Sequence, residues 1–129
     1  MDIATDKTHK NRTIEDFFEG LPAARALFDL VNNYICSLGP VKTEIMKTQV
    51  SFGLEKKFAW VWLPQMWTRK RSETSITLTI FLPRHVIDKR ITETVEPSPG
   101  KCIHHIVLEK ESDFDGEVRG WLSEAYHNK

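Results

Sequence analysis

Polar and aromatic side chains alternate along residues 47–64, KTQVSFGLEKKFAWVWLP, and this alternation offers the clearest binding chemistry in the chain. Lys47 and Gln49 stand two apart in its first half, and Trp60 and Trp62 stand two apart in its second half. Side chains two apart on a strand share a face, so the two pairs meet on one surface if the halves form a hairpin. Polar groups beside aromatic rings suit a small ligand or a peptide. An ordinary solvated sheet face, with the tryptophans packed under a helix, fits the same residues.

Two further side chains could join this surface. Arg84 closely follows a predicted strand and could offer a guanidinium fork to an anion. His105 follows His104, and because neighbours in a strand point to opposite faces, the two cannot bind one metal ion together. If Ile106 and Leu108 mark the core side, His105 projects to the opposite face. The sequence has no HxH, HExxH or CxxC spacing, so it predicts neither a metal site nor another cofactor.

Patterns that mark common catalytic sites are missing from the sequence. It contains no GxSxG motif, and its six glycines form neither GxGxxG nor a phosphate-binding loop. Cys36 falls within the apolar stripe of a predicted helix, not at a helix N-terminus, where a thiolate would be stabilised. The residues therefore give no support to catalysis, and an enzyme with an unrecognised site stays an alternative.

A second aromatic cluster lies just after the hairpin. Trp67 is followed by Arg69, Lys70 and Arg71, a combination that can bind single-stranded nucleic acid. The chain carries 18 Lys and Arg against 18 Asp and Glu, for a formal net charge of zero. Nucleic-acid-binding domains are typically basic, so the overall composition argues against such a partner. A nucleic-acid-interacting domain that uses Trp67–Arg71 stays a second alternative.

Length and composition are those of one soluble domain. The chain has 129 residues, of which 40% are hydrophobic and 28% charged, enough for one core. We expect residues 1–12 to be a flexible leader and residues 13–129 to form a single domain. No apolar stretch suits a signal peptide or a membrane span, and Cys36 and Cys102 suit small buried hydrophobes. A bacterial-type cytoplasm fits best, and the sequence indicates no oligomeric state.

Capping and breaker residues predict two helices at the start of the domain. Thr13 and Asp16 can form a capping box for a short helix over residues 14–19. Pro22 suits the first turn of a second helix, because a backbone N–H would have no partner there. Gly39, followed by proline, ends that helix.

The apolar period then changes from about 3.6 to 2, which predicts strands. These strands cover residues 41–46, 50–52, 58–63, 74–82 and 101–109. Residues 90–95 fit either a helical turn or an edge strand. Phe58, Trp60 and Trp62 should share one face of their strand, and because its other face is apolar too, we expect that strand to be central.

A final helix completes the pattern. Its predicted caps are Ser112 and Asp115, and its inward stripe consists of Phe114, Val118, Trp121, Leu122 and Ala125. The strands follow one another without βαβ alternation, so the predicted class is α+β. We expect an antiparallel sheet of four to five strands, with two N-terminal helices and one C-terminal helix packed on one face. The opposite face would then be free.

Five stretches of the sequence resemble one family. They are IEDFFEGLP, KTQVSFGLEKKFAWVWLP, TIFLPR, TVEPSPGKCIHHIVLE and DGEVRGWLSEAY. Over nearly all of residues 13–127 the chain resembles the bacterial domain-of-unknown-function family 5655. No activity is established for that family, so the resemblance implies a compact cytoplasmic domain and supplies no catalytic residue. More remotely, the element order resembles the YdhG-like domains, small α+β proteins sometimes linked to iron delivery, although the acidic cluster and extra histidines that iron would favour are missing.

Six residues match positions where the motifs of that family recur: Lys47, Gln49, Trp60, Trp62, Arg84 and His105. We therefore expect a binding module in which this set receives a small anionic or planar ligand, or a peptide. Lys47 and Arg84 would supply charge, Gln49 orientation, and the tryptophans apolar contact. No catalytic or metal-ligating residue and no membrane partner is predicted.

Overall fold

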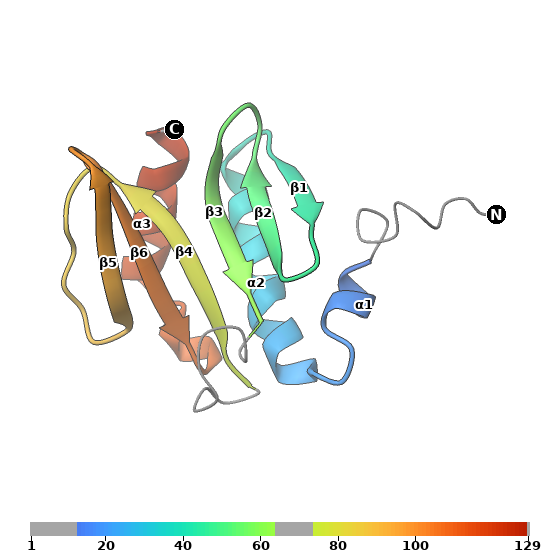
Figure 1. The fold of residues 1–129 in the computed structure, drawn as a ribbon. Helices are drawn as coiled ribbons and strands as arrows, with labels where there is room; N and C mark the ends of the chain where they lie inside the picture. Colours follow the sequence, from blue (N-terminus) through green and yellow to red (C-terminus); the bar gives the residue numbers. More distant parts are fainter. Residues whose placement is uncertain (1–12, 64–73, 129) are drawn as a thin grey trace.

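A computed structural model describes residues 13–63 and 74–128 of the chain. Its elements, in order, are α1 (Ile14–Phe17), α2 (Pro22–Leu38), β1 (Lys42–Ile45), β2 (Gln49–Gly53), β3 (Lys57–Trp62), β4 (Ile76–Leu82), β5 (Ile91–Ser98), β6 (Lys101–Leu108), the 3-10 helix η3 (Glu111–Asp113) and α3 (Gly116–His127). Figure 1 shows the helices and strands with these labels. The predicted leader, residues 1–12, and the Trp67–Arg71 cluster lie outside the described residues.

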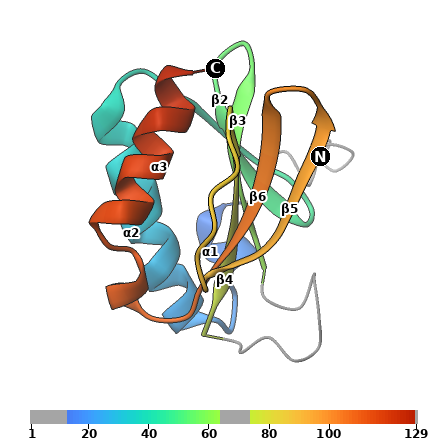
Figure 2. The same cartoon turned by 90° about the vertical axis from the view of Figure 1, so that its left-hand side faces the viewer.

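The strands form one antiparallel sheet in the order β1-β2-β3-β4-β6-β5. The predicted α+β class with an antiparallel sheet is confirmed, and the sheet has six strands where four to five were expected. The additional strand is β5, which occupies the region that fitted either a helical turn or an edge strand. In this order β6 lies between β4 and β5. The connection from β4 to β5 therefore passes over β6, on the side that carries the helices (Figure 2).

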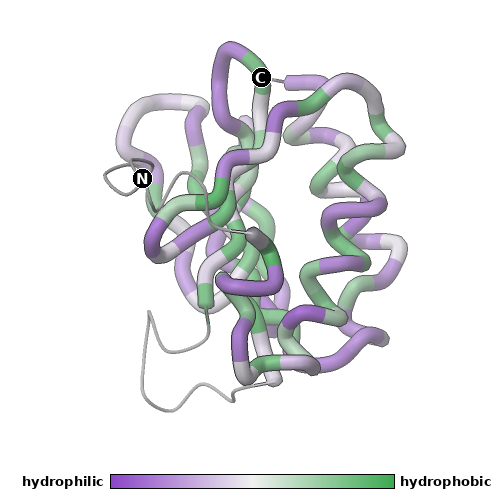
Figure 3. The backbone as a smooth tube through the Cα atoms, turned by 90° about the vertical axis from the view of Figure 1, so that its right-hand side faces the viewer, coloured by the Kyte–Doolittle hydropathy of each residue, from purple (hydrophilic) through white to green (hydrophobic). Residues whose placement is uncertain are grey.

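Both long helices cover one face of the sheet, as Figure 2 shows from the side. Period-2 alternation sends every second side chain of the central strands toward them: Val50, Val61, Leu78 and Ile106 are cross-strand neighbours and fully buried. Green hydrophobic segments recur along both layers in Figure 3. The inward stripe predicted for α3 is buried along its whole length. Apolar burial between the two layers is therefore what holds the helices on the sheet.

The caps of the first and last helices differ in how well they were predicted. Thr13 and Asp16 form the expected capping box at α1. At α3 the N-cap is Asp115 alone, whose carboxylate accepts hydrogen bonds from the Glu117 and Val118 amides. The other predicted cap, Ser112, lies inside η3 instead. The 3-10 turn inserted before the helix is the reason for this error.

Two further predictions about buried side chains were wrong. Phe58 does not share a face with the tryptophans, because the register of β2 and β3 shifts between Phe52 and Gly53. The irregularity leaves Phe58 unpaired and buried against Tyr126 of α3, with the ring centroids 5.4 Å apart. Cys36 lies on the exposed side of α2, and only Cys102 is the buried hydrophobe that was expected.

None of the described helices is both long and apolar enough to cross a membrane.

Candidate functional site

The sheet face opposite the helices, called the outer face below, carries most of the predicted site residues. Gln49 of β2 lies directly opposite Trp62 of β3, and Trp60 lies opposite Thr79 of β4. Directly opposed residues in an antiparallel pair share a face. His105 of β6 is in turn the partner of Thr79. The pairing therefore places Gln49, both tryptophans and His105 on one surface.

A buried hydroxyl joins two of these residues. The indole Nε1–H of Trp62 donates to Thr79 Oγ1 over 3.0 Å, and His105 Nδ1 lies 2.8 Å from the same oxygen. Thr79 is 4% exposed, so the hydroxyl needs these partners. Trp62 and His105 are each only half-buried. The arrangement fixes both side chains in position on the outer face.

The two polar residues predicted at the start of the hairpin are placed differently from each other. Lys47 precedes β2 and is exposed, whereas Gln49 is the half-buried first residue of the strand. The Gln49 side chain accepts a hydrogen bond from the Thr48 hydroxyl next to it. One of its acceptor sites is thus already used within the chain.

Arg84 is directed away from the outer face. Its guanidinium makes a two-point ion pair with Glu124 of α3, at 2.7 and 3.2 Å. Hydrogen bonding to Glu124 raises the pKa of Arg84 above its usual value. Because α3 packs on the opposite face of the sheet, the structure does not bring Arg84 together with the tryptophans.

A cavity of about 510 Å³ opens beside Trp60 at the start of β3. We call it the Trp60–Phe81 pocket, after two half-buried rings in its wall whose centroids lie 5.0 Å apart. The described residues that line it are Lys56, Lys57, Phe58, Trp60, Phe81, Leu82, Pro83, Gly100, Lys101, Ala125 and Asn128. Its size lies within the range of pockets for small molecules.

Strand geometry explains why a pocket forms at this place. Pairing between β3 and β4 ends at Ala59 and Ile80, whereas β4 continues beside β6 to Leu82. The unpaired Phe58 turns toward α3, so the two strands separate beyond this point (Figure 1). The separation leaves the flank of β4 at Phe81 without a strand partner on the β3 side. An irregular strand end thus opens the sheet beside its aromatic residues.

The charged side chains in the pocket wall are all cationic. Lys101 Nζ lies 5.2 Å from the centroid of the Phe81 ring, and Lys57 Nζ makes a 2.6 Å ion pair with Glu44. Hydrogen bonding to Lys57 lowers the pKa of Glu44. Lys56 and Lys101 have no carboxylate within ion-pair distance among the residues that the structure describes. The pocket is therefore electropositive.

Sequence reasoning found Trp60 and missed the rest of this pocket. Phe81 stands in the strand predicted over residues 74–82, and its own phase was not used. Lys101 is the first residue of β6 and directly follows Gly100. The phase of Phe81, opposite to that of its buried neighbours, was the signal that could have placed it with Trp60 on the outer face.

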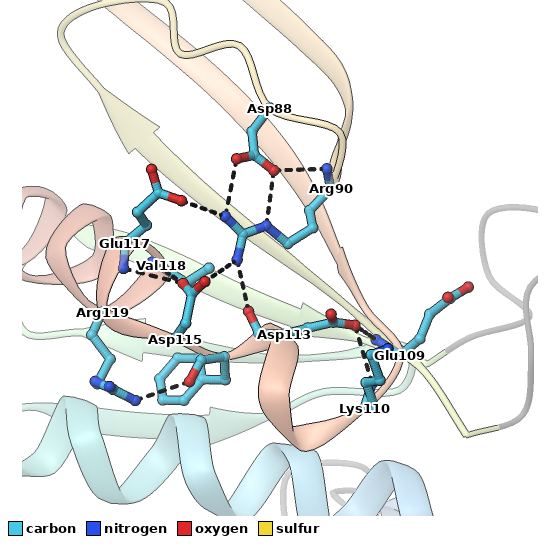
Figure 4. A network of polar contacts seen from close by, with 10 residues as sticks. Asp88, Arg90, Glu109, Lys110, Asp113, Asp115, Glu117, Val118 and Arg119 are labelled. Carbon is cyan, nitrogen blue, oxygen red and sulfur yellow. Dashed lines mark hydrogen bonds and ion pairs between the residues drawn. The ribbon is translucent and has the colours of Figure 1, made fainter.

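Arg90 is the centre of a polar cluster that the sequence did not reveal (Figure 4). Its guanidinium binds both carboxylate oxygens of Asp88, at 2.8 and 3.0 Å, and also Asp115 and Glu117 at the start of α3, each at 2.9 Å. The side chain is 11% exposed and lies over the ring of Trp121. Hydrogen bonding to Arg90 lowers the pKa of Asp88 to about 2. All three nitrogens of the Arg90 guanidinium have acceptors within the chain, so the cluster is a structural clamp between the β4–β5 connection and α3.

Two groups near the β4–β5 connection bear on metal binding. His104 is fully buried, and its Nε2 accepts the Val86 amide over 3.0 Å. Burial lowers the pKa of His104, and the Val86 amide already occupies its Nε2. Separately, His85, Glu96 and Cys102 present three donor atoms within 4.8 Å of one another. Burial, followed by the charge of Glu96, raises the pKa of Cys102.

Comparison with known proteins assigns a family without assigning an activity. No curated protein matches this chain, and no solved structure matches it. The remoter likeness to YdhG-like domains stays a prediction. The model of the family described as "Domain of unknown function (DUF5655)" matches residues 14–129, nearly the whole of the part that forms the fold. The chain therefore belongs to the DUF5655 family.

Proposed function

We propose that this domain binds a small anionic ligand with a planar, apolar part in the Trp60–Phe81 pocket. The observation that carries the proposal is the joining of two aromatic rings and three lysines in one cavity of about 510 Å³. Aromatic walls favour a planar group, and lysine ammonium groups favour an anion. The proposal keeps the ligand class that the sequence suggested and moves the site toward the β2–β3 turn. A peptide is the poorer fit, since the pocket is of small-molecule size.

Charges in the pocket wall orient the ligand. Ala125 and Asn128 belong to the last turn and C-cap of α3, where the helix dipole is negative. An anionic group is therefore disfavoured at that end. Lys56 and Lys101, which have no described carboxylate partner, offer the favourable position for it. The planar part then contacts Trp60 and Phe81.

The remaining outer-face residues take a supporting role in this proposal. Trp60 lies opposite Thr79 across the last part of the β3–β4 ladder, and Thr79 is held by Trp62 and His105. A shift of this hydrogen-bonded group would shift the backbone that carries Trp60. Trp62 and His105 would thus position the pocket wall without lining the pocket, and Lys47, Gln49 and Arg84 would have no direct contact with the ligand.

A matched pair of probes tests the proposal. In amide-detected NMR titrations, 2-naphthoate should shift the signals of the Trp60 indole and of the Gly100 and Lys101 amides. Its neutral analogue 2-naphthamide, with the same ring, should bind less tightly. Lys101→Gln should weaken naphthoate binding roughly 5-fold, because it removes one exposed cationic partner. It should leave naphthamide binding unchanged.

Lys89→Gln is the control, because it removes an exposed lysine of the β4–β5 connection that does not line the pocket. It should not change the affinity for naphthoate. Equal binding of the acid and the amide, or equal loss in the Lys101 and Lys89 variants, contradicts an anion site in this pocket. Shifts confined to other parts of the sheet contradict it as well.

A further inference from the structure

Three potential metal ligands meet at the start of β6, and none of them lines the Trp60–Phe81 pocket. His85 belongs to the β4–β5 connection, Glu96 to β5, and Cys102 to β6. Their donor atoms, one from each side chain, all lie within 4.8 Å of one another. His85 Nε2 is 2.9 Å from Glu96 Oε1, and the Cys102 side chain is buried beside this pair. Three consecutive parts of the chain thus bring together a nitrogen, an oxygen and a sulfur donor.

The donor types fit one class of metal ion. Thiolate and imidazole together select zinc-like divalent cations, whereas calcium and magnesium prefer oxygen ligands alone. In a tetrahedral zinc site each ligand atom lies about 2.0 to 2.3 Å from the metal, so the ligand atoms lie closer to one another than 4.8 Å. Small side-chain movements would shorten the present donor-to-donor distances to those of such a site. Glutamate and thiolate would together neutralise a divalent charge.

Two hydrogen bonds already hold the ligands in place. The second oxygen of Glu96 accepts the Gly100 amide over 3.0 Å, which leaves Oε1 directed at His85. The amide of Val86, next to His85, donates to the buried His104 Nε2 over 3.0 Å. The buried histidine therefore fixes the backbone that carries His85. Bonds of this kind behind the ligands orient metal sites in proteins.

The exposure of the three residues indicates an open site. His85 and Glu96 are 55% and 38% exposed in their side chains, whereas Cys102 is 1% exposed. A metal ion would therefore sit between a buried sulfur and two surface ligands, with one side toward solvent. Three protein ligands and one open position are the arrangement of catalytic rather than structural zinc sites.

We propose that His85, Glu96 and Cys102 bind one zinc-class divalent cation, with the fourth position open to water or to a small ligand. The inference is independent of the Trp60–Phe81 pocket, because it rests on different side chains. It differs from the sequence expectation, which considered only the His104–His105 pair and regular ligand spacings. The irregular spacing of residues 85, 96 and 102 results from the crossing of the β4–β5 connection over β6.

Cobalt(II) is the probe, because it occupies zinc sites and reports a bound thiolate by a sulfur-to-cobalt charge-transfer band. The full chain, freed of metal with a chelator, should develop this band up to one equivalent of cobalt, and zinc should abolish it by displacement. Cys102→Ser should abolish the band. His85→Ala and Glu96→Gln should each weaken cobalt binding at least about 10-fold, since even changes behind the ligands cost that much.

Matched controls come from the same residue types elsewhere. Cys36→Ser removes an exposed thiol, and His127→Ala removes an exposed histidine of α3. Both should leave the band and the affinity unchanged. If Cys102→Ser fails to fold, His85→Ala still decides, because its ring is largely exposed. Three results would overturn the site. The metal-free chain could give no charge-transfer band when cobalt is added, His85→Ala could retain the band at full affinity, or Cys36→Ser could lose it.

Discussion

Trp62 and His105 share one hydroxyl group, that of Thr79, although 43 residues separate them in the sequence (105 minus 62). Indole nitrogen can only donate, so Thr79 accepts from Trp62. The same oxygen lies 2.8 Å from His105 Nδ1. Three neighbouring strands are therefore joined by side chains as well as by their backbones.

Replacing Thr79 by valine should destabilise the domain by about 1 to 3 kcal/mol. The change keeps the shape of the side chain and leaves the buried end of the Trp62 indole without its acceptor. Urea unfolding, followed by far-ultraviolet circular dichroism, measures the difference in free energy.

Thr77→Val is the control, on the same strand and the same face. Thr77 is fully buried, and its Oγ1 has no hydrogen-bond partner among the described residues. Its replacement should be neutral or stabilising, because no bond is lost and an unsatisfied hydroxyl is removed. Equal destabilisation by the two changes would mean that the shared hydroxyl contributes nothing beyond packing.

Gly39→Ala should destabilise the end of α2. The residue has φ +149, and a Cβ there would collide with the hydroxyl of Tyr126, which donates to the Pro40 carbonyl over 3.0 Å. We expect a loss greater than about 1 kcal/mol in chemical denaturation, because the substitution is strained in both backbone and packing.

Gly120→Ala should stabilise the domain, whereas Gly39→Ala should destabilise it. Gly120 lies inside α3, and nothing would approach an added Cβ within 4 Å. The alanine variant should be more stable by up to about 1 kcal/mol, because glycine is a poor helix former. A destabilised Gly120→Ala variant would contradict the described packing of α3.

Acid should weaken the Arg90 clamp at a predictable pH. Asp88 has its pKa lowered to about 2 from a usual 3.8, chiefly by hydrogen bonding to Arg90. A carboxylate with a lowered folded pKa stabilises the fold above its unfolded pKa, and this contribution is lost as pH falls through about 2. Asp88→Asn should therefore lose roughly 2 kcal/mol at neutral pH.

The same variant should show a smaller loss of stability than the wild type between pH 5 and pH 2, because the titrating group is gone. Thermal unfolding at a series of pH values measures both effects. Parallel curves for the two proteins would indicate that Asp88 titrates normally in the fold.

Glu44→Gln should strengthen anion binding if the Trp60–Phe81 pocket is the ligand site. The change releases Lys57, whose ammonium is 2.6 Å from the Glu44 carboxylate, into the pocket wall. We expect naphthoate affinity to rise between about 2-fold and about 5-fold, in line with a partly exposed ion pair. Glu15→Gln, which alters an acid outside the pocket lining, should have no such effect. Weaker binding in Glu44→Gln would mean that the ion pair shapes the pocket.

Local sequence patterns predicted the fold correctly wherever one hydrophobic period dominated a segment. Pro22 and Gly39 bounded α2, and the alternation of Trp60 with Val61 separated the two faces of β3 correctly. The strand β5 was ambiguous because its residues, ITETVEPS, are polar on both faces and it lies at the sheet edge. An edge strand buries little, so its sequence carries a weak period.

The sequence predicted the site less well than the fold, because the site depends on contacts between distant segments. Arg84 was expected beside the tryptophans, and its partner Glu124 lies 40 residues away on a helix whose docking no local pattern specifies. Phe58 left the expected face because of one register shift at the strand end. Neither an ion pair across layers nor a bulge changes the hydrophobic period from which the prediction was made.

The place of β5 in the sheet has a consequence for synthesis of the chain. Its partner strand is β6, and the sheet order puts β6 between β5 and the rest of the sheet. A ribosome that has released residues up to Gly100 has therefore made a strand with nowhere to dock. Residues 91–98 must wait, exposed, until the eight residues of β6 have emerged, and a chain cut after Gly100 would lose two strands instead of one.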